Sequence, residues 1–272
     1  MTNADIVDRD TIRTFQEDGA VVLRGVFAPE WIDLLRGGVE IAMANPSHRA
    51  REYAAPGEGR FFTDHSLFDR FDAFRRFLFD SPAAEIAARL LGSHKINLYN
   101  EHLLVKEPGT GKPTYWHQDR PYYRIKGEQI VGLWTPLDAV SEATGSLRYV
   151  RGSHRWGKEF RPVFIGRGEE VAAADEFDGP VPDIDADPAA YPVLCHALEP
   201  GDCLALHVAT LHASRGNASS ATRRRALSVW LAGDDVTFHR RKYNPQNYDP
   251  PGLVEGGPID CEQFPRVWPR AA

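Results

Sequence analysis

Two histidines and an aspartate in this chain have the types and spacing that suit a metal ion. His117 and Asp119 form a His-x-Asp pair within the run YWHQD, and His212 follows much later in the chain. Two imidazole nitrogens and one carboxylate oxygen hold Fe(II) on one face and leave its other positions open for oxygen chemistry. Residues two apart on a strand project from the same face. We therefore expect His117 and Asp119 on one strand and His212 on a partner strand.

A basic run follows the second histidine, at Arg223, Arg224 and Arg225. The planar fork of an arginine pairs well with a carboxylate, so one of these residues is a candidate for binding a carboxylate co-substrate. Side chains alternate along a strand, so a shift of one residue in register changes which arginine faces the site.

The predicted elements that position these residues are mainly helices in the first third of the chain and mainly strands after it. The first third has helical patterns at residues 10–18, 29–43 and 82–91, a stripe of phenylalanines at 68–79, and a strand at 20–24. Asp10 is the expected N-cap of the first helix, and Gly19 and Gly92 are expected to end the first and last helices. From residue 95 onward short strands follow, at 95–105, 115–119, 130–138, 147–150, 202–208 and 225–231.

Short strands separated by Gly- and Pro-bearing turns favour a jelly roll or barrel over a parallel sheet. We expect one domain over residues 1–272, with a helical part at 1–93, a mainly β core at 94–233 and a tail at 234–272. Residues 161–192 are rich in Asp, Glu, Gly and Pro. This segment is either a solvated surface loop or a lid over the site.

The composition excludes several classes of protein. A hydrophobic content of 42% is enough for a core, and a net charge of −6 argues against a nucleic-acid partner. Neither a secretory signal nor an apolar run long enough for a membrane span is visible, so we expect a cytoplasmic protein without a membrane partner. The three cysteines, Cys195, Cys203 and Cys261, lack CxxC spacing and suit a reducing compartment.

Taken together, the motifs resemble those of the phytanoyl-CoA dioxygenase family, which includes ectoine hydroxylase and many bacterial small-molecule hydroxylases. The resemblance covers most of residues 20–231, and its blocks occur in the family's order. They are AVVL at 20–23 with Phe27, LLVKEPG at 103–109, WHQD at 116–119, WTPLD at 134–138, GSL at 145–147, GSH at 152–154, PGD at 200–202, HAS at 212–214 with Asn217, and RRALS at 224–228. Arg151 departs from the pattern, because the family commonly has proline there.

The resemblance implies a double-stranded β-helix, the cupin-like form of the jelly roll, and an oxygenase that uses Fe(II), 2-oxoglutarate and O2, with ascorbate to support turnover. His117, Asp119 and His212 then bind the iron. The family's register selects Arg224 for the 2-oxoglutarate carboxylate. The other residues implied or proposed around the co-substrate are Trp134, Asn100, Thr135 and Ser228, with His102, Lys106 and Ser214 close to the same site.

The reaction expected from this resemblance is hydroxylation of an unactivated C–H bond, with release of succinate and CO2. Related halogenases replace the carboxylate ligand with a small residue, whereas Asp119 is present here. Aromatic and basic residues next to the ligands are the candidates for contacting a small anionic or zwitterionic substrate. These are Trp116, Arg120, Tyr122 and Tyr123.

Two other functions fit the same residues. A cupin-type metalloenzyme that does not use 2-oxoglutarate would keep the metal ligands but would not need Arg224. A catalytically silent relative that binds a small ligand would keep the fold, although it would have no chemical need for Asp119. Activity without added 2-oxoglutarate distinguishes the first, and bound iron without succinate formation distinguishes the second.

Overall fold

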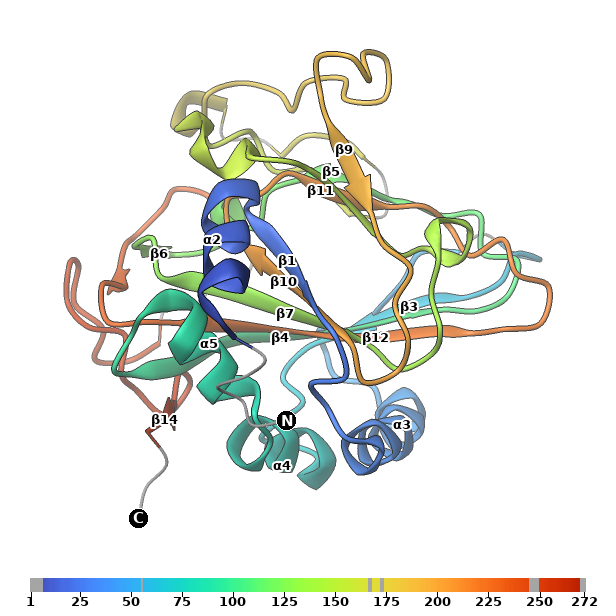
Figure 1. The fold of residues 1–272 in the computed structure, drawn as a ribbon, viewed down its shortest axis with the longest axis horizontal. Coiled ribbons are helices and arrows are strands. Elements are labelled where there is room, and N and C mark those ends of the chain that lie inside the picture. Colours follow the sequence, from blue (N-terminus) through green and yellow to red (C-terminus); the bar gives the residue numbers. More distant parts are fainter. Residues whose placement is uncertain (1–6, 55, 166–167, 172–173, 245–249, 270–272) are drawn as a thin grey trace.

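Two antiparallel sheets face each other in the computed structural model, which describes residues 7–54, 56–165, 168–171, 174–244 and 250–269 (Figure 1). The large sheet has eight strands in the order β1-β10-β7-β12-β4-β3-β2, with β14 also pairing with β4. Its strands are β1 (Ala20–Leu23), β2 (Arg51–Glu52), β3 (Phe61–Asp64), β4 (Ile96–Lys106), β7 (Ile130–Pro136), β10 (Cys203–His207), β12 (Arg224–Ala232) and β14 (Arg266–Trp268).

The small sheet has the order β5-β11-β8-β9. Its strands are β5 (Thr114–His117), β8 (Leu147–Val150), β9 (Val193–Cys195) and β11 (His212–Ser214), and a separate pair joins β6 (Ile125–Lys126) to β13 (Thr237–Phe238). Short 3-10 helices occur in the connections, at η1 (Arg120–Tyr122), η2 (Glu142–Thr144), η3 (Ser153–Trp156) and η4 (Ala174–Glu176). Two facing antiparallel sheets are the arrangement expected for a jelly roll.

Helices cover the face of the large sheet that is turned away from the small sheet (Figure 1). They are α3 (Pro29–Ala44), α4 (Asp72–Asp80) and α5 (Ala83–Leu91), while α2 (Arg9–Asp18) precedes β1. Pro29 opens α3 at its first turn, and Gly92 ends α5 in the left-handed conformation with φ 61°. The N-cap of α2 is Asp8 and not the expected Asp10, because the Asp8 carboxylate accepts a hydrogen bond from the Thr11 backbone.

The helical part is shorter and more mixed than expected. The phenylalanine stripe becomes helical only from Asp72, and β2 and β3 follow α3 and extend the large sheet. A pattern of closely spaced aromatic residues suits a helix or an extended segment that packs on a core. Pairing with β4 decides the conformation of residues 61–64.

Alternation along β12 separates two apolar cores. Leu227 and Val229 pack with the helices in one core, whereas Ala226 and Trp230 pack with residues of the small sheet in the other. Successive side chains on a strand point to opposite faces, so the remaining even-numbered residues of β12 also face the interior between the sheets. None of the helices in the described ranges combines the length and apolar character needed to cross a membrane.

Candidate metal centre

The three predicted metal ligands meet between the two sheets. His117 ends β5 and His212 begins β11, and the two residues lie directly opposite each other in the ladder. The ligand atoms of His117, His212 and Asp119 all lie within 4.8 Å of one another. The Asp119 carboxylate oxygens lie 3.8 Å from His117 Nε2 and 3.4 Å from His212 Nε2.

Backbone carbonyls fix the orientation of both imidazole rings. His117 Nδ1–H donates to the Tyr115 carbonyl at 2.7 Å, and His212 Nδ1–H donates to the Thr210 carbonyl at 2.9 Å. This leaves Nε2 of each ring available to a metal, and a hydrogen bond on the other nitrogen is the usual support for a metal-bound histidine. Burial lowers the pKa of both histidines to about 4, so both rings are neutral and ready to act as ligands at neutral pH.

Asp119 reaches the same point from a turn. The expectation of a single strand through both ligands is wrong, because β5 ends at His117 and Asp119 has φ −83° and ψ −28° at the start of η1. Its backbone N–H donates to the Val208 carbonyl at 3.1 Å, which ties this turn to the end of β10. Burial raises the pKa of Asp119 to about 6, although the nearby His117 lowers it. A bound cation would favour the ionised carboxylate.

Arg224 lies in the same interior and is 1% exposed. Its guanidinium makes only long contacts, at 3.5 Å, to the Leu104 carbonyl and to Ser214 Oγ, and its Nε has no hydrogen-bond partner among the described residues. The guanidinium carbon lies 5.9 Å from the centre of the Trp134 ring. Burial lowers the pKa of Arg224 to about 10, so the side chain still carries its charge at neutral pH.

A second buried cation stands beside this arginine. Lys106 is fully buried on β4, and its Nζ donates to Ser214 Oγ at 3.0 Å and to the Arg215 carbonyl at 2.7 Å. Burial and the charge of Arg224 lower the pKa of Lys106 well below its usual range. Two basic groups that share one serine hydroxyl make a site that suits an anion, because buried charge is costly without a compensating partner.

One cavity of about 50 Å³ joins the metal ligands to Arg224. Both sheets contribute to its walls. The residues that line it include His117, Asp119, His212, Arg224, His102, Trp134, Ser214, Ser228 and Trp230. A carboxylate that reaches Arg224 can therefore belong to a molecule whose other end contacts the metal.

Known proteins share both this sequence pattern and this fold. The sequence profile of a family described as phytanoyl-CoA dioxygenase (PhyH) matches residues 15–226. The chain belongs to this family. A probable alpha-ketoglutarate-dependent hypophosphite dioxygenase from Stutzerimonas stutzeri is 30% identical over 170 residues, which cover 62% of this chain and 56% of that relative.

Solved structures confirm the double-stranded β-helix. The non-heme alpha ketoglutarate dependent carbocyclase SnoK from nogalamycin biosynthesis superposes with a TM-score of 0.76 at 22% identity, over 98% of each chain. The epimerase SnoN, in a complex with Fe3+, alpha ketoglutarate and nogalamycin RO, gives a TM-score of 0.72 at 19% identity, over 95% of this chain and 97% of SnoN.

Strand alternation decides which residue of the basic run faces the phytanoyl-CoA dioxygenase-type site. Arg224 points inward with Ser228. Arg223 instead pairs with Glu40 and Glu107, and Arg225 pairs with Asp138 and Glu40. The structure thus agrees with the register taken from the family pattern.

Two residues proposed beside the co-substrate do not reach this cavity. Thr135 is fully buried next to the Cys203 thiol, because Trp134 occupies the inward face of β7 and the next residue must point the other way. Asn100 donates to the Tyr123 hydroxyl at 3.3 Å and lines a separate, outer cavity. The structure therefore places neither side chain on the wall shared by Arg224 and the metal ligands.

The residues proposed to contact substrate surround the metal ligands in different ways. The Tyr122 ring lies edge-on to His117 at 5.9 Å, and the Tyr123 ring packs against Trp230. Arg120 pairs with Glu128, and Trp116 Nε1 donates to Asp185. The two tyrosines are therefore close to the site, whereas Arg120 and Trp116 are held by neighbouring carboxylates.

Part of the segment 161–192 lies over the site. Tyr122 hydroxyl donates to the Val163 carbonyl at 2.6 Å and accepts from the Val163 backbone N–H at 2.8 Å, and Ile165 lines the metal cavity. Ile184 is buried in a small core with Leu211. Val163 and Ile165 thus pack at the site, whereas most of the other described residues of this segment are exposed or half-buried. Residues 166–167 and 172–173 lie outside the described residues.

Our sequence analysis missed Trp230 and Gly132, which line the metal cavity from adjacent strands. A Cβ atom on Gly132 would lie 2.7 Å from the Trp230 ring, so only glycine leaves room for that indole. Trp230 continues the inward-facing series of Arg224 and Ser228 at a spacing of two. This alternation was the available signal for Trp230, whereas no local pattern identifies Gly132.

Proposed function

We propose that this protein is an Fe(II)- and 2-oxoglutarate-dependent dioxygenase that hydroxylates a C–H bond of a small anionic or zwitterionic molecule and releases succinate and CO2. One observation carries the proposal. The free ligand atoms of His117, Asp119 and His212 converge on a cavity that also reaches the buried, unpaired Nε of Arg224.

The donor set fits the two groups that this reaction needs. Two neutral imidazoles and a carboxylate suit Fe(II), and they leave positions for a chelating co-substrate and O2. When bound, iron and 2-oxoglutarate supply the oxidising chemistry, while the protein supplies binding, orientation and exclusion of water.

Arg224 has the role of holding the distal carboxylate of 2-oxoglutarate. Its orphaned Nε and its two long contacts leave donors free for a bidentate ion pair. Ser214, which Lys106 holds in place, and Ser228 on the same cavity wall can donate further hydrogen bonds to that carboxylate. Trp134 packs against the guanidinium and limits the orientations that it can adopt.

A small anionic substrate agrees with the name of one relative, the probable hypophosphite dioxygenase of Stutzerimonas stutzeri. Ile165 lines the metal cavity, and the Tyr122 hydroxyl holds the Val163 backbone two residues away. A cover on this side limits the access of water, and limiting water protects a strongly oxidising reaction from side reactions. We also propose that the protein is located in the cytoplasm.

The test is succinate formation from 2-oxoglutarate by the purified protein with Fe(II), ascorbate and O2. We expect succinate that depends on both iron and 2-oxoglutarate, and an Arg224→Ala variant with a KM for 2-oxoglutarate raised roughly ten- to hundredfold. Arg223→Ala is the matched control, because its side chain faces Glu40 and Glu107 and not the cavity.

Two results would contradict the proposal. Product formation that persists without 2-oxoglutarate would indicate a cupin-type metalloenzyme. Equal KM values for 2-oxoglutarate in Arg224→Ala and Arg223→Ala would show that Arg224 does not bind the co-substrate.

A further inference from the structure

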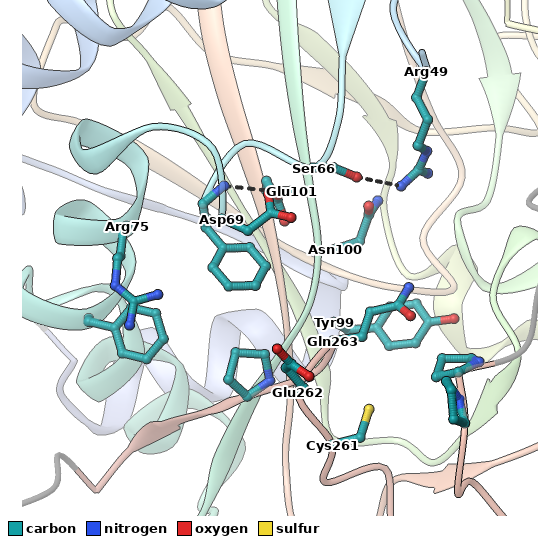
Figure 2. A pocket seen from close by; sticks show the side chains of 15 residues that line it. Arg49, Ser66, Asp69, Arg75, Tyr99, Asn100, Glu101, Cys261, Glu262 and Gln263 are labelled. Carbon is teal, nitrogen blue, oxygen red and sulfur yellow. Dashed lines mark hydrogen bonds between the residues drawn. The ribbon is translucent and has the colours of Figure 1, made fainter. Parts of the chain in front are cut away.

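A second, larger cavity lies along β4 (Figure 2). β3 pairs with the last residues of β4, and β14 pairs with its first residues. Between these two ladders, Tyr99, Asn100 and Glu101 line a cavity of about 790 Å³. This volume lies in the range of roughly 300–1,000 Å³ that is typical of small-molecule sites.

Arg49 brings a positive charge to this cavity. It is partly buried, and its guanidinium donates to Ser66 Oγ at 3.3 Å (Figure 2). No carboxylate of the described residues forms an ion pair with Arg49. By contrast, Arg120, Arg161 and Arg241 are each held by a glutamate. Arg75, the other arginine that lines this cavity, is exposed and lies over the Phe79 ring at 5.0 Å. Arg49 is thus the partly buried arginine of this cavity whose donors are left for a ligand.

The partner of Arg49 is held in a strained backbone conformation. Ser66 has φ 58°, and it is the one non-glycine residue with positive φ among the described residues. Such conformations cost about 1–3 kcal/mol and occur often at functional sites. Its neighbours are fixed on β4, because His65 stacks on His102 at 4.0 Å and the Leu67 N–H donates to the Glu101 carboxylate. The hydroxyl that orients Arg49 is therefore rigidly placed.

Adjacent residues of β4 line the outer cavity and the metal cavity, because Asn100 and Glu101 belong to the first and His102 to the second. His102 lines the metal cavity, and its pKa is lowered well below the usual range by burial and by the charges of His65, Arg49, His117 and Arg224. Charges from both cavities thus act on one imidazole. Asn100, on the wall of the outer cavity, donates to the hydroxyl of Tyr123, whose pKa Asp119 helps to raise. The walls of the two cavities therefore meet along residues 100–102 of β4.

The remaining surface of the outer cavity combines aromatic rings and prolines with polar and acidic groups. Phe68, Phe79 and Tyr99 contribute rings, and the acidic residues Asp69 and Glu262 are exposed at its rim. The planar guanidinium of Arg49, with aromatic side chains close by, suits a ligand that has a carboxylate at one end and an apolar group at the other.

Building on the proposed function, we propose that this outer cavity is the substrate site and that Arg49 binds the carboxylate of an amphipathic organic acid. The apolar body of the acid lies against the aromatic walls, and the carbon to be oxidised points past His102 and Asn100 toward the metal. The substrate carboxylate is thereby kept apart from the 2-oxoglutarate carboxylate at Arg224.

The test is binding of matched probes to the full chain loaded with Fe(II) and 2-oxoglutarate, measured by titration calorimetry under argon. The probes are 3-phenylpropanoate, 4-phenylbutanoate and 5-phenylpentanoate, each compared with its primary amide. We expect wild-type protein to bind at least one acid roughly ten- to hundredfold more tightly than its amide. We expect Arg49→Ala to lose this preference, and Arg49→Lys to retain part of it.

Arg76→Ala is the matched control, because Arg76 is an exposed arginine of α4 that pairs weakly with Asp72 at 4.0 Å. It should bind the acids like wild type. Equal binding of every acid and its amide to wild-type protein overturns the assignment, and so does a preference that persists in Arg49→Ala. If Arg49→Ala fails to fold, an acid-over-amide preference in Arg49→Lys as large as that of wild type overturns the assignment. Wild-type protein that prefers the acids but forms no succinate contradicts the proposed function and not this assignment.

Discussion

Arg224 lines the inner cavity and Arg49 lines the outer cavity together with the exposed Arg75, and the protein holds Arg224 and Arg49 in different ways. Arg224 belongs to the central strand β12 and is enclosed by β4 and β7. Arg49 comes from the connection between α3 and β2 and depends on a strained serine. A rigid sheet can fix the residues that all members of a family need, while connecting segments vary with the ligand.

The two cavities also differ in the acidic residues that line them. Asp119, the carboxylate on the described wall of the inner cavity, is aimed at the metal position, whereas the outer cavity includes Asp69, Glu101 and Glu262. The inner cavity therefore suits one anionic co-substrate. The outer cavity, with charges of both signs, can distinguish among substrates.

The largest expected effect comes from removing the carboxylate of the inner cavity. We expect Asp119→Ala to lose stoichiometric iron binding and to reduce succinate formation by about a thousandfold or more, since the metal contributes several kcal/mol to catalysis. Iron content and succinate formation, measured on the same preparation, check this. Asp69→Ala is the control from the outer cavity, and iron loss of similar size in both variants would contradict the division between the two cavities.

Glu101, the buried acidic residue on the wall of the outer cavity, should make the stability of the protein depend on pH. Burial raises the pKa of Glu101 to about 7 from the usual 4.5. The folded protein thus binds this proton more tightly than the unfolded chain, so the stabilising contribution is full below pH 4.5 and is lost as the pH rises through 7. The loss is at most about 3 kcal/mol.

Glu101→Gln keeps an oxygen for the Leu67 N–H and removes the titration. Relative to wild type, its free energy of unfolding should therefore rise as the pH increases across this window. Urea unfolding of both proteins at pH values on either side of the window measures the difference. Parallel pH profiles for the two proteins would show that Glu101 does not titrate in this range.

A change from Arg224 to lysine separates charge from geometry in the inner cavity. The charge is kept but the second hydrogen bond of the guanidinium is lost, so we expect the KM for 2-oxoglutarate to rise roughly three- to fivefold, less than for Arg224→Ala. Initial rates of succinate formation at varied 2-oxoglutarate concentrations measure this. A variant indistinguishable from wild type would mean that the inner arginine acts as a point charge only.

The smallest expected effect concerns the strained serine of the outer cavity. Ser66→Gly removes the hydroxyl that contacts Arg49 and relieves the positive φ, and these changes oppose each other in stability. We expect the free energy of unfolding to change by less than about 1 kcal/mol, with a severalfold loss in acid-over-amide preference. Chemical denaturation and the probe titration measure the two quantities. A loss as large as that of Arg49→Ala would show that Ser66 itself contacts the ligand.

Much of the inner site could be predicted because strand alternation and motif order are local properties. His117, Asp119, His212 and Arg224 were all predicted as site residues, and the structure brings them to one cavity. Thr135 shows the limit of reasoning from motif proximity, because it follows Trp134 on the same strand and must face the opposite side. The alternation rule that selected Arg224 would also have excluded Thr135.

By itself, the sequence determined the type of ligands, the alternating inward face of β12 and the presence of short strands, since these depend on residue types and on periodicity within one segment. Only the tertiary structure decided that His117 and His212 are ladder partners, that Lys106 and Arg224 share Ser214, and that Asp119 reaches the metal position from a turn. The same is true of Arg49, which no motif distinguishes from the other arginines. Its proximity to the site depends on how β3 and the preceding connection fold back onto the edge of β4, and this is a matter of long-range pairing that residue order along the chain does not reveal.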